Sequence, residues 1–332
     1  MKTKNNIVIG IDTSCYTTSI AAISFDRDII LNEKIMLKVK KDSKGLRQSE
    51  AVFQHVNNLG YISEQLNKIL EECNVVAICA SSRPRPIENS YMPVFTVGLN
   101  FAKLYSTISG SKFYETTHQE NHIEAVLLNS RIINKKRFLS VHISGGTTEI
   151  LLSEKLSEDS ANEDYNIEIV GGTRDVSFGQ LIDRLGVEFG YEFPCGKYID
   201  ENSLNCDLNI EKGLKTSVKD GYMNLSGIEN QINNFIKEKY RNIESADKNY
   251  VSKLLMDTLS RSISKSLIYI CEKYEVYEVL FAGGVSASKY LSKSITEKLS
   301  KNDIKAYFSE PKYSTDNAVG CAIIGLNKFL GE

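Results

Sequence analysis

The chain has 332 residues, of which 42% are hydrophobic and 25% are charged, and its formal net charge is −2. This composition is ordinary for a globular protein with a sizeable core, and the length suits two domains. The small net charge argues against strong non-specific attraction to nucleic acid, although a local basic patch could still bind RNA.

The cysteines and the N-terminus indicate a reducing compartment. Seven cysteines are scattered without any C-x-x-C pair, which indicates neither a disulfide framework nor a cysteine zinc site. Only about five apolar residues precede Asp12, too few for a signal peptide, and no run of about 18 apolar residues occurs. We therefore expect a cytoplasmic protein with no membrane partner.

The first 130 residues predict strands and helices that alternate around a mixed sheet. Apolar runs indicate strands, and apolar residues at helical spacing indicate amphipathic helices. The expected strands are 7–11, 19–25, 29–39, 75–80 and 112–116, and the expected helices are 49–72, 93–109 and 118 to about 128. His55 lies in the first helix, where we expect it to be solvated or to act as a cap.

A second series of strands, from residue 138, resembles the first. Each series opens with an apolar strand and a turn of small residues, Asp12-Thr13-Ser14-Cys15 and Ser144-Gly145-Gly146-Thr147. This similarity indicates an internal duplication. The expected strands are 138–143, 148–152, 167–170, 279–282 and 305–309, and the expected helices are 176–190, 247–274, 286–299 and one after residue 317.

His118 and His122 are two of only four histidines, and they lie four residues apart on an expected helix. Positions i and i+4 share one face of a helix, so one metal ion could bind both imidazoles. Two exposed histidines on a polar face would give the same spacing. The zinc-protease motif requires Glu directly after the first His, where Gln119 stands, so the spacing does not favour a protease.

Three turns that follow strands could approach a ligand. Ser144-Gly145-Gly146-Thr147-Thr148 offers backbone N–H groups and hydroxyls to an anion, although a tight hairpin without a ligand would have the same sequence. Asp12 suits a hydrated cation or the cap of a turn. Gly283-Gly284-Val285 lies between a strand and a helix, whose N-terminus favours a nucleotide.

Six short motifs occur in the order and spacing of one family. They are Ile9-Gly10-Ile11-Asp12-Thr13-Ser14-Cys15, His118-x-x-x-His122, Ser144-Gly145-Gly146-Thr147-Thr148, Asp183 thirteen residues before Gly196, Ala282-Gly283-Gly284-Val285, and Ser314-Thr315-Asp316-Asn317-Ala318. From about residue 7 to residue 326 the chain resembles the bacterial TsaD family, once labelled O-sialoglycoprotein endopeptidases. The joint order of the motifs is far more specific than any one of them.

This resemblance implies an α/β fold of two RNase H-like lobes, as in the actin-like and sugar-kinase ATPase superfamily, with a nucleotide cleft between them. We expect lobes at 1–130 and 131–332, with a largely polar, irregular insertion around 200–245. The family's enzymes transfer a threonylcarbamoyl group from threonylcarbamoyl-AMP to N6 of adenosine 37 in tRNA. Partner proteins of the tRNA-modifying complex bind alongside them.

The resemblance also implies the site residues. Carried over by position, His118, His122 and Asp316 would bind one divalent metal, iron or zinc, and leave coordination positions open for substrate. An adenylate or ATP would bind at His142, Ile143, Ser144, Gly145, Gly146, Asp183, Gly196 and the turn that contains Ser288. Asp183 could accept hydrogen bonds from a ribose, or instead pair with Arg184 or solvent. Gly196 could allow close backbone approach, or simply form a turn after Pro194.

Several positions depart from the family pattern. Tyr16 and Thr17 stand where the family has Asp-Glu, Thr147 replaces a His, Ser288 replaces an Asn, and Arg83-Pro84-Arg85-Pro86 replaces a Gly-Pro-Gly turn. Two alternatives to the transferase therefore stay open. One is a non-catalytic paralogue that binds nucleotide and metal and forms a heterodimer with a relative. The other is an ATP-dependent carbamoyl- or phosphotransferase that acts on a small molecule.

Overall fold

The computed structural model describes residues 4–14, 16–39, 46–87, 89–128, 136–155, 165–211, 213–240, 242–244, 246–308 and 311–332. Cys15, which belongs to the first motif, lies outside these residues. The chain divides into two compact units: Met1–Ile133, Lys155–Asn166 and Thr315–Glu332 form the first, and Asn134–Glu154 and Ile167–Ser314 form the second. Within the described residues, no helix has the length and apolar character needed to cross a membrane.

The first unit is built on a five-stranded sheet in the order β3-β2-β1-β4-β5. Its strands are β1 (Asn5–Thr13), β2 (Thr17–Ser24), β3 (Ile29–Met36), β4 (Cys73–Arg83) and β5 (Lys112–Thr117). β1 is antiparallel to β2 and parallel to β4, and β4 is parallel to β5. The C-terminal ends of β1, β4 and β5 therefore meet at one edge of the sheet.

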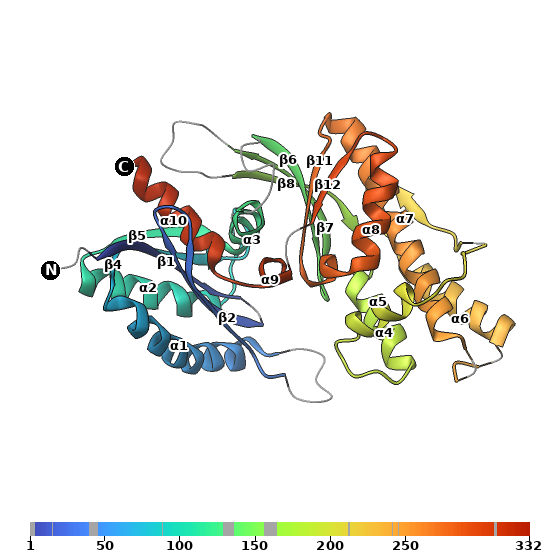
Figure 1. The fold of residues 1–332 in the computed structure, drawn as a ribbon, viewed down its shortest axis with the longest axis horizontal. Coiled ribbons are helices and arrows are strands. Elements are labelled where there is room, and N and C mark those ends of the chain that lie inside the picture. Colours follow the sequence, from blue (N-terminus) through green and yellow to red (C-terminus); the bar gives the residue numbers. More distant parts are fainter. Residues whose placement is uncertain are drawn as a thin grey trace. The chain divides into compact units, whose positions relative to one another are not determined.

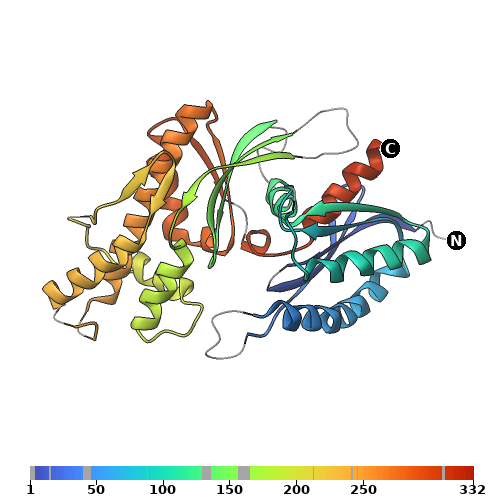
Figure 2. The same cartoon turned by 180° about the vertical axis from the view of Figure 1, so that it is seen from behind.

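Helices cover both faces of this sheet (Figures 1 and 2). They are α1 (Gln48–Leu70), α2 (Phe95–Ser109), α3 (His118–Leu127) and α10 (Val319–Gly331). A Cβ added at Gly10 of β1 would lie 2.5 Å from the backbone N of Ala322 in α10, whereas Gly98 of α2 lies against Ile11. Because neighbouring strand residues point to opposite faces, α2 and α10 pack on opposite sides.

The second sheet has seven strands in the order β12-β11-β6-β7-β8-β10-β9. They are β6 (Arg137–Ile143), β7 (Thr148–Lys155), β8 (Tyr165–Thr173), β9 (Ser217–Lys219), β10 (Tyr222–Asn224), β11 (Glu278–Ala282) and β12 (Lys305–Phe308). β6 is antiparallel to β7 and parallel to β11, which is parallel to β12. This arrangement repeats that of the first sheet, so the predicted duplication is confirmed.

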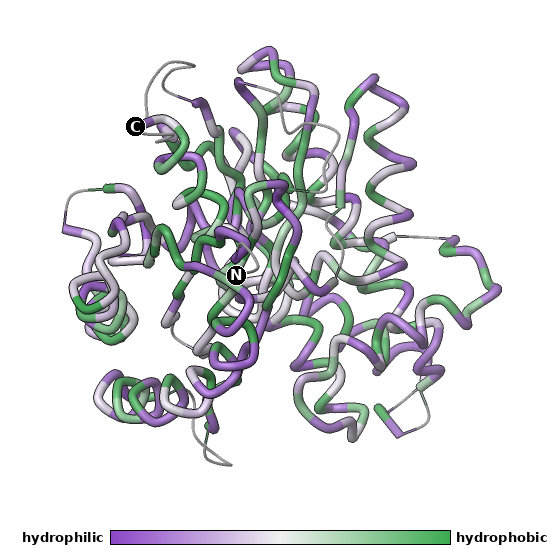
Figure 3. The backbone as a smooth tube through the Cα atoms, turned by 60° about the vertical axis from the view of Figure 1, so that its left-hand side comes forward, coloured by the Kyte–Doolittle hydropathy of each residue, from purple (hydrophilic) through white to green (hydrophobic). Residues whose placement is uncertain are grey.

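The second unit also contains α4 (Phe178–Glu188), α5 (Gly196–Leu204), α6 (Ser226–Tyr240), α7 (Lys248–Tyr274), the short 3-10 helix η1 (Gly284–Ala287), α8 (Lys289–Ser300) and α9 (Pro311–Ser314). The longest helix, α7, is central to its core, with buried Val251, Leu255, Leu259, Ile263, Leu267 and Ile270. Figure 3 shows helices whose turns alternate between hydrophobic and hydrophilic residues, as expected when one face packs on a core.

The region 200–245 is more regular than expected. Instead of a largely irregular insertion, it contains the end of α5, the short strands β9 and β10, and the 15-residue helix α6. Ile228, Ile232 and Ile236 are buried at successive i+4 positions and join the core around α7. The intervening Asn, Lys and Glu residues made this segment look polar, although its apolar stripe is helical.

The division of the chain differs from the expected lobes at the C-terminus, because Thr315–Glu332 belongs to the first unit. Its backbone packs closely on α3: a Cβ at Gly320 would lie 1.9 Å from the carbonyl oxygen of Asn121. The buried Asn121 amide donates to the Asn317 carbonyl at 2.6 Å and accepts from the Cys321 N–H at 2.8 Å. These contacts bring Asp316 to the helix that carries the two histidines.

Candidate metal centre and nucleotide-binding turns

The start of α3 is fixed by a capping box. The Thr117 hydroxyl accepts a hydrogen bond from the Glu120 N–H at 3.3 Å, and the Glu120 carboxylate accepts one from the Thr117 N–H at 2.9 Å. This reciprocal pair satisfies two backbone donors and sets the first residue of the helix. His118 and His122 therefore occupy one face of α3, at the edge where the parallel strands of the first sheet end.

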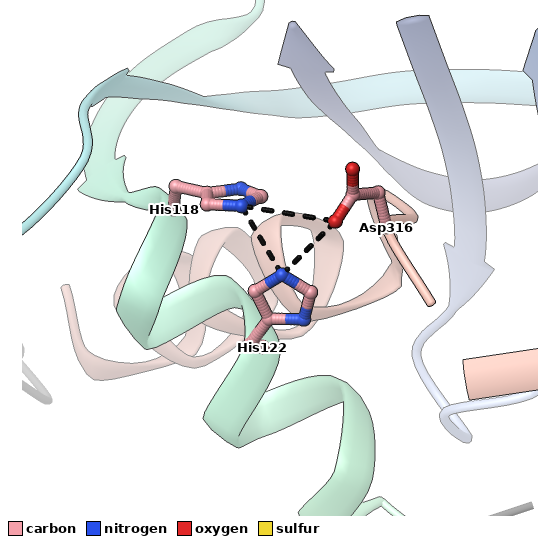
Figure 4. A group of neighbouring side chains, drawn as sticks. All are labelled: His118, His122 and Asp316. Carbon is pink, nitrogen blue, oxygen red and sulfur yellow. Dashed lines mark hydrogen bonds and ion pairs between the residues drawn. The ribbon is translucent and has the colours of Figure 1, made fainter. Parts of the chain in front are cut away.

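His118, His122 and Asp316 converge on one point (Figure 4). The Nε2 atoms of the two histidines are 3.1 Å apart, and Asp316 Oδ1 lies 3.2 Å from Nε2 of His122 and 3.9 Å from that of His118. Ligand atoms around a tetrahedral metal with bonds of about 2.0–2.2 Å are about 3.3–3.6 Å apart. These residues could therefore hold one metal ion.

Two further side chains orient these ligands. Nδ1 of His118 lies 3.1 Å from both carboxylate oxygens of Asp12, which is fully buried and accepts a hydrogen bond from the Ser81 hydroxyl. The Ser14 hydroxyl donates to Oδ2 of Asp316 at 2.9 Å, which leaves Oδ1 toward the imidazoles. A carboxylate behind an imidazole fixes the tautomer that presents the other nitrogen to a metal. The sequence did not indicate this role of Asp12.

The charges of the site are strongly coupled. Burial lowers the pKa of His118, but the Asp12 and Asp316 carboxylates together raise it, to about 9. Burial raises the pKa of Asp316, yet the hydrogen bond from His122 and the charges of both imidazoles hold it well below its usual range. Because a metal requires unprotonated imidazole nitrogens, a metal that binds here would release a proton.

His55 was expected to be solvated or to act as a cap, and this expectation was wrong. Its ring is completely buried, with Nδ1 2.8 Å from the Thr18 hydroxyl and Nε2 2.8 Å from the Ser14 carbonyl. Since a carbonyl only accepts, Nε2 carries the hydrogen and Nδ1 accepts from Thr18. His55 falls in line with buried Ala51 and Leu59 at i±4, a signal that was present in the sequence.

The candidate nucleotide-binding residues lie in the second unit. Ser144 and Thr147 close a hairpin between β6 and β7, in which the Ser144 N–H donates to the Thr147 carbonyl at 2.8 Å. His142 and Ile143 end β6, and Gly145 and Gly146 are exposed in the turn. The hairpin geometry is therefore present, with both glycines open to a ligand.

The turn after β11 lies beside this hairpin because β11 pairs with β6. Gly283 has a φ of +93°, and a Cβ there would lie 2.3 Å from the Ile143 carbonyl oxygen. Only glycine fits this position. The first turn of α4 also packs on the hairpin, because a Cβ at Gly179 would lie 2.4 Å from the Gly145 Cα.

Asp183 and Gly196 are linked through Cys195. The Asp183 carboxylate accepts a hydrogen bond from the Cys195 N–H at 2.8 Å, and Gly196 begins α5. Burial raises the pKa of Asp183, and this hydrogen bond lowers it. Arg184 pairs instead with Glu229 at 2.7 Å, so the alternative of an Asp183–Arg184 pair was wrong.

Ser288 is the N-cap of α8, where its hydroxyl accepts a hydrogen bond from the Leu291 N–H at 3.0 Å and donates one to Asp200. Asp200 of α5 also accepts from the N–H groups of Lys289 and Tyr290 at 3.1 and 3.0 Å. Asp200 thus ties the helix that starts at Gly196 to the turn after Gly283. The sequence offered no signal for it beyond its position in a polar segment.

The family model for TsaD, described as tRNA N6-adenosine threonylcarbamoyltransferase, matches residues 49–323. The chain belongs to the TsaD family. The predicted membership is therefore confirmed.

Curated relatives of the TsaD family match nearly the whole chain. The tRNA N6-adenosine threonylcarbamoyltransferase of Riemerella anatipestifer is 28% identical over 338 residues, which cover 98% of this chain and 94% of the relative. The protein of the same name from Thermotoga neapolitana is 25% identical over 325 residues, which cover 97% and 94%. These relatives are transferases by name.

Solved structures show the same fold. Full-length HypF in a phosphate- and nucleotide-bound form and HypF of T. kodakarensis have TM-scores of 0.58 and 0.59, each at 12% identity over 98% of this chain. The chain spans only 46% and 48% of those proteins. Component A of the Acidaminococcus fermentans (R)-2-hydroxyglutaryl-CoA dehydratase has a TM-score of 0.52 and 11% identity, with 97% and 98% of the two chains covered. The expected actin-like, sugar-kinase-type fold is confirmed.

Proposed function

We propose that this protein is an acyltransferase that moves a threonylcarbamoyl group from threonylcarbamoyl-AMP to N6 of adenosine 37 in tRNA, together with protein partners. The observation that carries this proposal is the convergence of His118, His122 and Asp316 in a member of the TsaD family. Asp316 reaches the histidines only because the C-terminal segment packs on α3, and this packing is itself tightly specified by Gly320.

His118, His122 and Asp316 would hold a divalent metal, iron or zinc, with Asp12 and Ser14 as the groups that orient them. A metal bound by three protein ligands has open positions and supplies Lewis-acid stabilisation to a carbonyl or phosphoryl oxygen. The chain's own contribution is to keep the Nε2 atoms of both histidines directed at one point. Asp12 does so for His118, because its carboxylate keeps the hydrogen on Nδ1.

The adenylate would bind at the hairpin of residues 142–146 in the second unit. Exposed backbone N–H groups of Gly145 and Gly146 would approach its phosphate, and Asp183 would accept a hydrogen bond from a ribose hydroxyl. Gly196 stands at the start of α5, where N-terminal N–H groups favour an anion. Ser288 would approach the nucleotide from the turn before α8, whose first N–H groups already donate to Asp200. The contact between Gly283 and Ile143 holds two of these turns together.

A second candidate is a nucleotide- and metal-binding paralogue that does not catalyse transfer and pairs with an active relative. It is favoured by Tyr16 and Thr17, which stand where the family resemblance expects acidic residues. The Tyr16 ring is 48% exposed and Thr17 is buried, and neither side chain supplies a carboxylate. Acylation of an amine releases a proton, so a missing carboxylate could remove a base.

A transfer assay tests the proposal. Purified protein would be incubated with threonylcarbamoyl-AMP, unmodified tRNA and the partner proteins, and the digested nucleosides would be weighed by mass spectrometry. We expect threonylcarbamoyladenosine with the wild-type protein and with Lys68→Ala, an exposed change in α1, and at least 100-fold less with His118→Ala. No modified adenosine with the wild-type protein would contradict the proposal, and recovery of a related paralogue by pull-down would then favour the second candidate.

A further inference from the structure

The last residue of β4 and the connection that follows it to α2, together residues 83–94, start at the candidate metal centre. Near the end of β4, the Ser81 hydroxyl donates to Asp12, the carboxylate that orients His118. Two residues later, Arg83 pairs in the β4–β5 ladder with Thr117, the residue directly before His118. The point at which the chain leaves the sheet is therefore set by the same strand ends that position the metal ligands.

The connection also returns to the metal centre. The Val94 carbonyl accepts a hydrogen bond from the buried Thr13 hydroxyl at 2.9 Å, one residue after Asp12 in β1. Phe95, the first residue of α2, is buried, and its ring centroid lies 5.7 Å from that of His118. Both ends of the connection are thus fixed against residues around the metal candidates.

Hydrogen bonds also order the middle of the connection. The Pro84 carbonyl accepts from the Gln119 N–H at 3.0 Å, within the first turn of α3, and the Arg85 N–H donates to the Ser90 hydroxyl at 3.1 Å. Three prolines, Pro84, Pro86 and Pro93, restrict the backbone further. The structure describes this connection except for residue 88. It is a defined surface feature beside the histidines.

This feature presents a cation and an aromatic ring to solvent. Arg83 is exposed, and none of the described residues forms a hydrogen bond or ion pair with its guanidinium. The Tyr91 side chain is 66% exposed. Guanidinium groups bind phosphates through paired N–H donors, and exposed tyrosines stack on unpaired bases, so the two together are typical of single-stranded RNA recognition.

We propose that the connection of residues 83–94 binds RNA, with Arg83 on a backbone phosphate and Tyr91 stacked on an unpaired base. The inference rests on the proposed function, in which an adenosine in a tRNA loop must reach the metal centre. With a net charge of −2, the chain as a whole does not attract RNA, so local groups must bind it. Arg83 and Tyr91 lie on a segment that is tied to His118 at both ends.

The Arg83 contact is tested by the salt dependence of tRNA binding. Fluorescence anisotropy would measure the affinity of the full-length protein for labelled, unmodified tRNA across a salt series. We expect Arg83→Ala to weaken binding about 5- to 10-fold at low salt and to reduce the slope of log K against log salt by about 0.7–1. Arg83→Lys, which keeps the charge, should restore most of the slope. Lys68→Ala is the matched control, because the end of α1 lies by Asn5, at the opposite end of β1 from Asp12.

The Tyr91 contact is tested with a matched tyrosine. Tyr61 of α1 is also 66% exposed, so Tyr61→Ala removes the same ring from another part of the first unit. We expect Tyr91→Ala to weaken tRNA binding about tenfold with little change in the salt slope, and Tyr91→Phe and Tyr61→Ala to bind like the wild type. Both positions are on the surface, so thermal melting should be unchanged in every variant.

The outcomes separate this inference from the proposed function. If Arg83→Ala and Tyr91→Ala bind tRNA like their controls, the inference is overturned while the transfer assay stands by itself. If Arg83→Ala weakens binding of AMP and not of tRNA, the phosphate belongs to the adenylate, and the RNA assignment is again overturned. Wild-type protein that does not bind tRNA would overturn the inference, whereas the proposed function is tested separately by the transfer assay, which includes the partner proteins. Loss of tRNA binding in the two variants supports the inference even if no transfer is detected.

Discussion

Asp12 would act on the candidate metal centre through His118. Asp12→Asn preserves the size of the side chain but removes the charge that holds a hydrogen on Nδ1, 3.1 Å away. We expect metal affinity to fall about 10- to 100-fold, as measured by titration with zinc and a competing chelator. Ser82→Ala is a suitable control, because among the described residues the Ser82 hydroxyl donates only to the Thr116 carbonyl. Equal affinities in wild type and Asp12→Asn would contradict this role.

His55 makes the stability of the first unit depend on pH. Burial lowers the pKa of His55, and the Ser14 hydrogen bond and the Asp12 charge offset only part of this effect. In the unfolded chain, His55 has the ordinary pKa of about 6.5. Below that pH the unfolded state therefore binds the extra proton, and stability is lost as pH falls from about 7 toward the folded pKa. Urea unfolding between about pH 5 and 8 should show this loss in wild type but not in His55→Gln. If the free energies of unfolding of wild type and His55→Gln differ by the same amount at every pH, His55 does not cause the pH dependence.

At the level of elements, the contact of β1 with α10 controls where Asp316 lies. A Cβ at Gly10 would lie 2.2 Å from the Ala318 carbonyl oxygen, two residues after Asp316, so Gly10→Ala must displace this backbone. We expect a loss of about 1–3 kcal/mol in the free energy of unfolding, together with weaker metal binding. A Cβ at Gly60 in α1 meets no described atom within 4 Å, so Gly60→Ala should stabilise the helix by about 0.5–1 kcal/mol. A Gly10→Ala protein as stable as wild type would show that the packing is looser than described.

For the molecule as a whole, the elements and the duplication could be predicted from the sequence. The strands are short apolar runs, and α1 and α7 carry apolar stripes of helical period, so their position follows from local patterns. The two openings, at Asp12 and at Ser144, were enough to predict an internal duplication, because each follows an apolar strand and precedes a returning one. The strand order of the two sheets confirms it.

The contacts between distant segments could not be predicted from such patterns. Asp316 was assigned to the site of the two histidines only through the family resemblance. It reaches them because the backbone at Gly320 packs on Asn121 of α3 and the Asn121 amide donates to the Asn317 carbonyl. Asp200 and Asp12 were not given their roles, because a carboxylate that binds a helix terminus or an imidazole looks like any polar residue. α6 was missed because its three buried isoleucines are separated by polar residues.

The proposed function depends on one metal ion held by His118, His122 and Asp316. Metal analysis of purified wild-type protein, His118→Ala and the control Lys68→Ala tests it most directly, with the metal content of each sample measured per chain. We predict about one divalent metal ion per chain in wild type and control, and less than about a tenth of that in His118→Ala, because a site of three ligands loses one. Equal metal content in wild type and His118→Ala would contradict the account.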